Sequence, residues 1–113
     1  MDETISGKSP VGRRLSRIRK TELRFLVHGG RRVRIAHEMT IGRDKGNTIV
    51  IDDPLVSRIH CIVHRIRNSW YIEDADSTNG TWVNEKRLTP GKSIRLEPMD
   101  TIKLGGRIEV GLV

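Results

Sequence analysis

The sequence is poor in the features that define several large classes of protein. It contains one cysteine, Cys61, which excludes an internal disulfide and a cysteine-rich zinc site. No apolar run approaches the roughly 20 residues that a membrane-spanning helix needs. The first 20 residues also lack the apolar stretch of a secretory signal peptide. We therefore expect a cytoplasmic chain without a transmembrane segment, and nothing in the composition implies a metal or a cofactor.

Positive charge is in excess and is concentrated near the N-terminus. The 113 residues include 21 Lys and Arg against 14 Asp and Glu, a net charge of +7. Residues 1–20 hold six basic and two acidic side chains, so +4 of that charge lies there. Together with the turn-rich residues 6–10, this composition predicts a flexible basic arm over residues 1–21. A short amphipathic helix with Val11, Leu15 and Ile18 on one face is the alternative.

From residue 22 the pattern changes to short apolar segments that alternate with polar residues. We expect strands at 23–28, 32–36, 39–42, 48–51, 59–66, 70–72, 81–83, 94–96, 102–104 and 108–112. Residues 59–66 are apolar on both faces in places, and Trp70, Tyr71 and Trp82 are expected in the core. The pattern predicts an all-β fold over residues 22–113, an antiparallel β-sandwich of about ten to eleven short strands.

Three of the predicted loops are rich in groups that bind anions. Residues 41–47, 52–58 and 74–80 contribute arginine guanidinium groups, serine and threonine hydroxyls, and asparagine amides. Such donors suit a phosphate dianion, which offers three acceptor oxygens. Glycines in these loops allow backbone N–H groups to approach an anion closely. The loops therefore indicate a phosphate-binding surface at one end of the sandwich.

The order of these polar residues resembles the pattern of the forkhead-associated (FHA) domain family. The resemblance runs from about residue 23 to residue 113 and rests on Gly42-Arg43, Asn47, Ser57-Arg58-x-His60, Ser77-Thr78-Asn79-Gly80-Thr81 and Asn84. It implies a β-sandwich that binds phosphothreonine peptides without catalysis. The implied partner is a phosphothreonine-containing protein or peptide in Ser/Thr kinase signalling, either a kinase or its substrate.

The resemblance also implies which side chains would bind the peptide. Arg43 would contact the phosphate, Ser57 would donate its hydroxyl to a phosphate oxygen, and Thr78 would supply a second donor. Arg58 and Asn79 would hold the peptide backbone and its neighbouring side chains. Arg58 is also a candidate contact for the phosphate.

Other matching positions would support the loops. The resemblance implies a close backbone approach at Gly42, a loop-fixing hydrogen bond from His60 and a tight turn at Gly80. Asn47 would either order the first loop or line the peptide groove. Where the family often has glycine after Asn84, this chain has Glu85, and we expect a wider hairpin there.

Other functions remain open on the residues alone. Ser57 and His60 lack the Gly-x-Ser-x-Gly context of a hydrolase nucleophile, so no enzyme is expected. Four acidic loop residues are expected to form turns and to pair with arginines: Asp52, Asp53, Asp74 and Asp76. The basic arm leaves nucleic-acid binding as a less favoured alternative, and a phosphate-independent docking scaffold as another. The arm itself, phosphorylated on a threonine such as Thr4, is a further candidate ligand for the loops.

Overall fold

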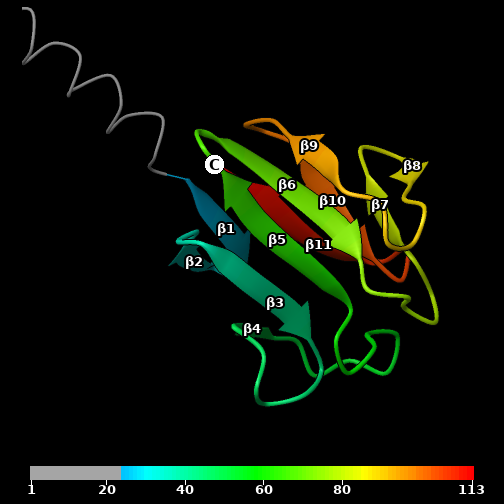
Figure 1. Cartoon of the computed structure of the whole chain (residues 1–113). Coiled ribbons are helices and arrows are strands. Elements are labelled where there is room, and N and C mark those ends of the chain that lie inside the picture. The colour runs from blue at the N-terminus through cyan, green and yellow to red at the C-terminus, as the bar shows by residue number, and fades with distance from the viewer. Residues whose placement is uncertain (1–23) are drawn as a thin grey trace, which may run out of the picture.

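The computed structural model describes residues 24–113, which form eleven strands in two facing sheets (Figure 1). The strands are β1 (Phe25–His28), β2 (Arg31–Arg34), β3 (Glu38–Gly42), β4 (Ile49–Val50), β5 (Cys61–Ile66), β6 (Ser69–Asp74), β7 (Thr81–Val83), β8 (Lys86–Arg87), β9 (Ile94–Leu96), β10 (Thr101–Leu104) and β11 (Ile108–Leu112). The arm predicted over residues 1–21 lies outside the described residues. In the described part of the chain, no helix is long and apolar enough to cross a membrane.

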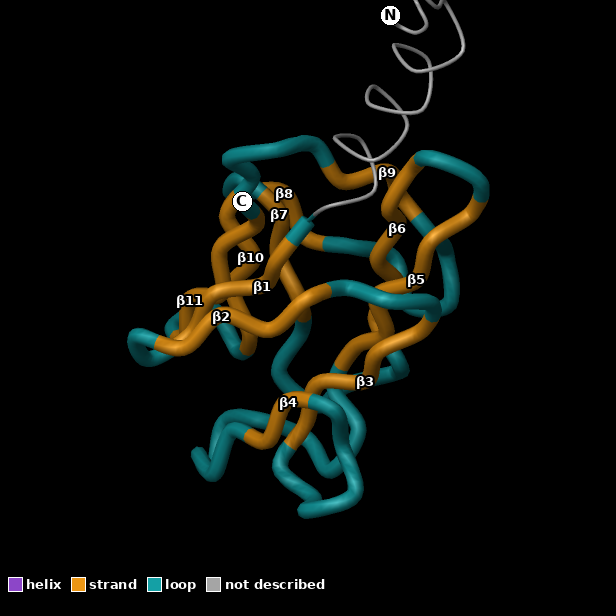
Figure 2. Tube along the Cα trace, turned by 90° about the vertical axis from the view of Figure 1, so that its left-hand side faces the viewer, coloured by secondary structure: helices purple, strands orange, loops and turns teal. Residues whose placement is uncertain are grey.

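The two sheets form the layers of the predicted β-sandwich. One sheet has six strands in the order β2-β1-β11-β10-β7-β8, and the other has five in the order β4-β3-β5-β6-β9 (Figure 2). Neighbouring strands are antiparallel except β3 and β4, which pair in parallel with Ile41 opposite Ile49. The β1–β2 connection is a two-residue turn at Gly29-Gly30, where both residues have positive φ.

The core forms where alternate side chains of both sheets meet. The aliphatic side chains with no exposed surface include Leu26, Ile41, Val63, Ile72 and Ile102. Each such aliphatic side chain contributes about 1.5–3 kcal/mol when it leaves water. Trp70 is 5% exposed and joins this core as predicted. The alternation thus fixes which face of each strand points inward.

Two other aromatic residues are not in the core, and for them the prediction is wrong. Tyr71 and Trp82 are half-buried on the outer faces of their sheets, because each lies between two inward-facing neighbours. The Tyr71 ring stacks on His64 with 6.0 Å between centroids. The Arg87 guanidinium covers the Trp82 ring at 5.1 Å from its centroid.

The strand predicted over residues 59–66 begins later, at Cys61. Ile59 belongs to the preceding loop and is 51% exposed, so it does not contribute to the sandwich interior.

Burial raises the pKa of the Cys61 thiol and the charge of Asp74 raises it further, which keeps this thiol neutral.

The hairpin after β7 is tight, so the expected wider turn is wrong. Val83 pairs with Lys86, which leaves only Asn84 and Glu85 in the turn. Both have positive φ, 49° and 74°, as a type I′ turn requires. Glu85 therefore occupies a conformation that glycine adopts at less cost. The following strand, β8, was not predicted, because both of its residues are polar and exposed.

Candidate functional site

The loop after β3 is fastened to the loop before β5 by backbone and side-chain bonds. The N–H of Arg43 donates to the Ser57 carbonyl at 2.9 Å, and the N–H of Asp44 donates to the Arg58 carbonyl at 3.2 Å. The Asn47 amide donates to the carbonyls of Asp44 and Arg58 at 2.8 and 2.7 Å. The sequence left two roles open for Asn47, ordering the first loop or lining the peptide groove. Because Asn47 is only 9% exposed, its position fits the first role.

Gly42 lies where these two loops approach most closely. A Cβ atom on Gly42 would overlap the Arg58 carbonyl and would lie 2.8 Å from the Asn47 amide nitrogen. Its φ is not positive, so glycine is required here by space rather than by backbone conformation. This is the close backbone approach that the sequence predicts.

His60 joins the second loop to the third from a fully buried position. Its Nδ1 accepts the Ser57 N–H at 3.0 Å, and its Nε2 lies 2.8 Å from the Gly80 carbonyl oxygen. Since Nδ1 accepts, Nε2 carries the proton and donates to Gly80. Both ring nitrogens are therefore used in fixing the two loops, which leaves neither for acid–base chemistry.

The third loop is built around the carboxylate of Asp74 at the end of β6. Asp74 Oδ1 accepts the hydroxyls of Ser77 and Thr81, and Oδ2 accepts the Ser77 N–H at 3.0 Å. Burial opposes its ionisation, but the hydrogen bonds from Ser77 and Thr81 outweigh burial and hold the Asp74 pKa below its usual value. The ionised carboxylate thus organises the turn that carries Thr78 and Asn79.

The third loop also contacts the second directly. The N–H of Thr78 donates to Ser57 Oγ at 3.0 Å, and the Asn79 amide donates to the Leu55 carbonyl at 3.1 Å. Gly80 has a φ of +91°, and its N–H donates to Ser77 Oγ at 2.9 Å. The backbone at Gly80 is therefore the tight turn that was predicted there.

These contacts leave a set of donors exposed on the three loops; the segments that follow β3 and β4 lie below these two strands in Figure 2. Arg43, Arg58 and Thr78 are exposed, and Ser57 is half-buried. Within residues 24–113, no side-chain hydrogen bond or ion pair engages the guanidinium groups of Arg43 or Arg58. The Ser57 hydroxyl accepts from Thr78, so its own proton is available for another acceptor.

The role of Asp74 in the third loop was not predicted from the sequence. Asp74 bonds hydroxyls rather than an arginine, so the arginine pairing expected for it is wrong. The signal was its spacing, three residues before Ser77 and seven before Thr81. Asp53 does form a turn, since its carboxylate accepts the Leu55 N–H at 2.9 Å.

The fold and these loops together define a β-sandwich that presents hydrogen-bond donors on three interconnected loops at one end. The family model of the FHA domain matches residues 39–105, which is more than half of the chain. The chain therefore belongs to the FHA domain family, as the sequence pattern predicts.

Similar proteins extend this assignment. A stretch of 74 residues is 31% identical to the FHA domain-containing protein PS1 of Arabidopsis thaliana and covers 64% of this chain and 5% of that protein. A stretch of 78 residues is 36% identical to the E3 ubiquitin-protein ligase RNF8 of Bos taurus and covers 65% of this chain and 16% of that protein. In both cases the match spans less than a fifth of the relative's length.

Solved FHA domains share the fold. The solution structure of the FHA domain of an Arabidopsis thaliana hypothetical protein has a TM-score of 0.74 at 29% identity, covering 80% of this chain and 84% of that chain. A structure from a study of phosphothreonine-dependent FHA domain interactions has a TM-score of 0.71 at 28% identity, covering 80% of this chain and 94% of that chain.

Proposed function

We propose that this chain is a non-catalytic module that binds phosphothreonine peptides and so mediates phosphorylation-dependent protein–protein interaction in Ser/Thr kinase signalling. The observation that carries the proposal is the arrangement of the three loops. Buried bonds from Asn47, His60 and Asp74 fix their backbones, while the side chains of Arg43, Arg58 and Ser57 keep donors for a ligand.

The phosphate is assigned to Arg43 and Ser57. A phosphate carries about −1.5 to −2 charges near neutral pH and has three acceptor oxygens, which match a guanidinium fork and a hydroxyl. Ser57 serves as a donor because its oxygen already accepts the Thr78 N–H, which directs its proton to an outside acceptor. The exposed hydroxyl of Thr78 supplies the second donor from the third loop.

The remaining site residues are assigned to the peptide and to the loop backbones. Arg58 and Asn79 hold the peptide backbone and its neighbouring side chains, and Arg58 is also a candidate contact for the phosphate. Asn79 contacts the peptide while its amide holds the Leu55 carbonyl, which fixes its orientation. The supporting residues are Gly42, Asn47, His60 and Gly80. The FHA domain spans residues 22–113 in this proposal, and residues 1–21 form a separate basic arm.

Relatives support the ligand class. The structure from the study of phosphothreonine-dependent FHA domain interactions is 28% identical to this chain. The partner proposed here is a phosphothreonine-containing segment of a Ser/Thr kinase or of its substrate. A phosphorylated threonine in the arm is an intramolecular candidate for the same loops.

An oriented phosphothreonine peptide library tests the proposal. The wild-type protein should select phosphothreonine sequences over the same library with unphosphorylated threonine. One charge-assisted hydrogen bond contributes roughly 1.5–3 kcal/mol, so Arg43→Ala should weaken binding by about tenfold to a hundredfold. Lys45→Ala is the matched control, since it removes an exposed charge from the same loop, and it should change affinity by about twofold at most.

Two results would redirect the assignment. Equal selection of phosphorylated and plain peptides that survives Arg43→Ala would indicate a phosphate-independent docking scaffold. Binding of DNA or RNA that falls steeply with salt, without selection of phosphothreonine, would indicate the nucleic-acid alternative.

A further inference from the structure

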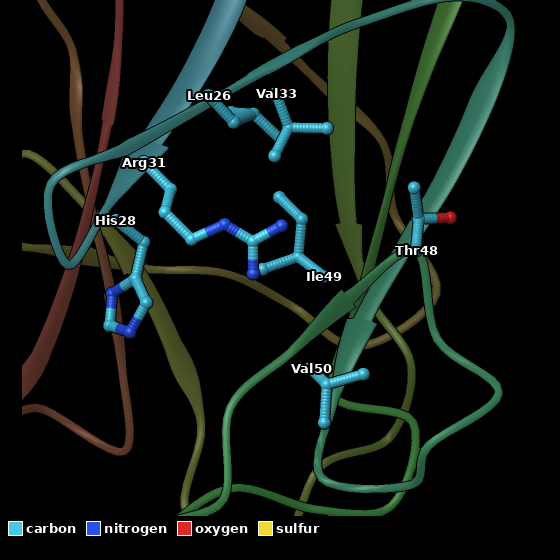
Figure 3. A pocket seen from close by; sticks show the side chains of 7 residues that line it. All are labelled: Leu26, His28, Arg31, Val33, Thr48, Ile49 and Val50. Atoms are coloured by element: carbon cyan, nitrogen blue, oxygen red, sulfur yellow. The ribbon is translucent and has the colours of Figure 1, made fainter.

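A cavity of about 220 Å³ opens on the flank of the sandwich, between β1 and β2 on one side and β4 on the other (Figure 3). Its apolar lining comes from Leu26, Val33, Ile49 and Val50, and its polar lining includes His28 and Arg31. We call these six residues the β2–β4 groove. Leu26 and Ile49 are buried, whereas Val50 is 44% exposed, so apolar surface continues from the core to the outside.

The groove exists because the sandwich is not closed at this flank. β2 is the last strand of the six-stranded sheet, and β4 is the last strand of the five-stranded sheet. The two edges belong to different sheets and do not pair with one another, so side chains alone bridge the gap. In Figure 3 the Arg31 side chain extends across this gap toward Ile49, with His28 beside it.

β2 has a free backbone edge as well. In a hairpin with a two-residue turn, His28 and Arg31 form a hydrogen-bonded pair, and such pairs recur at every second residue. The N–H of Ile35 donates to the Arg24 carbonyl at 2.9 Å, which agrees with this alternation. Arg32 and Arg34 are the alternate residues, so their N–H and C=O groups point away from β1 toward the open edge.

This edge is strongly basic. Three of the four residues of β2 are arginine, and all three are exposed. Within residues 24–113, no carboxylate forms an ion pair with Arg31 or Arg34. Arg31 lies on the groove side of the strand, in register with His28, whereas Arg32 and Arg34 lie on the opposite side. Both faces of β2 therefore carry arginines beside the apolar groove, and the free edge of β2 can pair with a further strand.

We propose that the free edge of β2 and the β2–β4 groove bind an extended acidic segment of a partner protein. The segment adds as a strand beside β2, through the outward backbone groups of Arg32 and Arg34. Its side chains alternate: apolar ones enter the groove over Ile49 and Val50, and acidic ones on the other face meet Arg32 and Arg34. The occupant is therefore a peptide in which acidic and apolar residues alternate.

A nucleic acid fits this surface less well. Phosphate backbones need basic side chains but no apolar groove, and single strands bind on exposed aromatic rings. Phe25, the aromatic residue of β1, is covered by the Arg32 guanidinium at 4.4 Å from its ring centroid. The combination of apolar groove, free strand edge and arginines instead matches an acidic polypeptide.

This site is separate from the phosphate-binding loops and does not depend on the proposed function. None of its six residues is among those assigned to phosphopeptide binding, and the loop residues 51–60 and 75–80 do not line the cavity. A partner that carried both a phosphothreonine and an acidic segment would gain avidity from the two sites, but neither site requires the other.

The test uses the 113-residue protein and a short unphosphorylated probe peptide in which Glu alternates with Val. The probe should bind, and in an NMR titration the amides of Arg32, Arg34 and Val50 should shift most. Arg34→Glu removes one attraction and adds one repulsion, so it should weaken binding by about tenfold. Lys86→Glu is the matched control, because it reverses one exposed charge on β8, at the opposite edge of the same sheet. It should change affinity by about twofold at most.

Further arms separate the contributions of charge and of the groove. Replacing Glu with Lys in the probe should abolish binding, and replacing Val with Ser, or making Val50→Asp in the protein, should weaken it. Arg43→Ala should leave the affinity for the Glu-Val probe unchanged. The proposal is overturned if the probe does not bind, if Arg34→Glu and Lys86→Glu behave alike, or if Arg43→Ala removes binding. Arg34-dependent binding of single-stranded DNA or phosphatidylserine vesicles, without binding of the probe, would also refute a peptide partner.

Discussion

The buried amide of Asn47 allows a sharp test of how the loops are held. It donates two hydrogen bonds, at 2.8 and 2.7 Å, to carbonyls of Asp44 and Arg58. Each contributes about 1 kcal/mol net, so their loss would cost about 2 kcal/mol. Asn47 Oδ1 is buried without a partner, and Asn47→Ala removes that unpaired acceptor along with the donors. We therefore expect Asn47→Ala to lower the free energy of unfolding by about 1–2 kcal/mol.

Asn47→Asp preserves the shape of the side chain but replaces the donating nitrogen with an oxygen. Two carbonyl oxygens would then face a buried carboxylate. Each would lose its side-chain donor, at a cost of about 1 kcal/mol, and keep its backbone donor, so the unpaired buried charge accounts for most of the penalty. Asn47→Asp should lower the unfolding free energy by about 3–5 kcal/mol, more than Asn47→Ala does. Urea unfolding at neutral pH, followed by tryptophan fluorescence, measures both. If Asn47→Asp were the milder substitution, the residue would be filling space rather than bonding the two loops.

Further predictions concern strain, charge and peptide binding. Glu85→Gly should raise the unfolding free energy by about 0.5–1 kcal/mol, because the residue at this turn has a φ of +74°; urea unfolding measures it, and a loss of stability would contradict the strained turn. Since the folded-state pKa of Asp74 lies below 3.8, its stabilisation is present above that pH and is lost as pH falls through the folded pKa. Asp74→Asn should therefore flatten the dependence of stability on pH below about 4, and an unchanged acid transition would argue against an ionised hub. Ser57→Ala should weaken phosphopeptide binding by about tenfold, because it removes one hydroxyl donor and leaves the Arg43 contact in place. Calorimetry measures the affinity, and an unchanged Kd would contradict a bond from Ser57 to the phosphate.

The alternation of side chains made most of the sandwich predictable. Where one face of a strand is buried, as in β5 and β6, hydrophobic residues at every second position mark that face. The same rule places Trp82 outward between Thr81 and Val83, but its position in an apolar segment suggested the core. β8 carries no such mark, because Lys86 and Arg87 are both exposed and only the tight turn aligns them with β7.

The candidate site was predictable in its residues but not in its bonding. The order of Gly42-Arg43, Ser57-Arg58 and Thr78-Asn79 could be found along the chain. The bond from the Thr78 N–H to Ser57 Oγ joins residues 21 positions apart, and the His60–Gly80 bond joins residues 20 apart. Periodicity carries no information on such contacts, because they depend on where the sheets place the loop ends. The β2–β4 groove was not predicted for the same reason, since it lies between edge strands of different sheets.

Isothermal titration calorimetry with one library-selected peptide tests phosphate recognition by Arg43 most directly. The peptide is prepared with phosphothreonine, phosphoserine or threonine at one position and titrated into the wild type and Arg43→Ala. The wild type should bind the phosphothreonine form with a Kd on the order of micromolar, the phosphoserine form about fivefold or more weakly because a methyl contact is lost, and the threonine form not measurably. Arg43→Ala should weaken the phosphothreonine titration by about tenfold to a hundredfold. Equal affinities for the phosphothreonine and threonine forms, or an Arg43→Ala variant that binds like the wild type, would contradict a phosphate site at these loops.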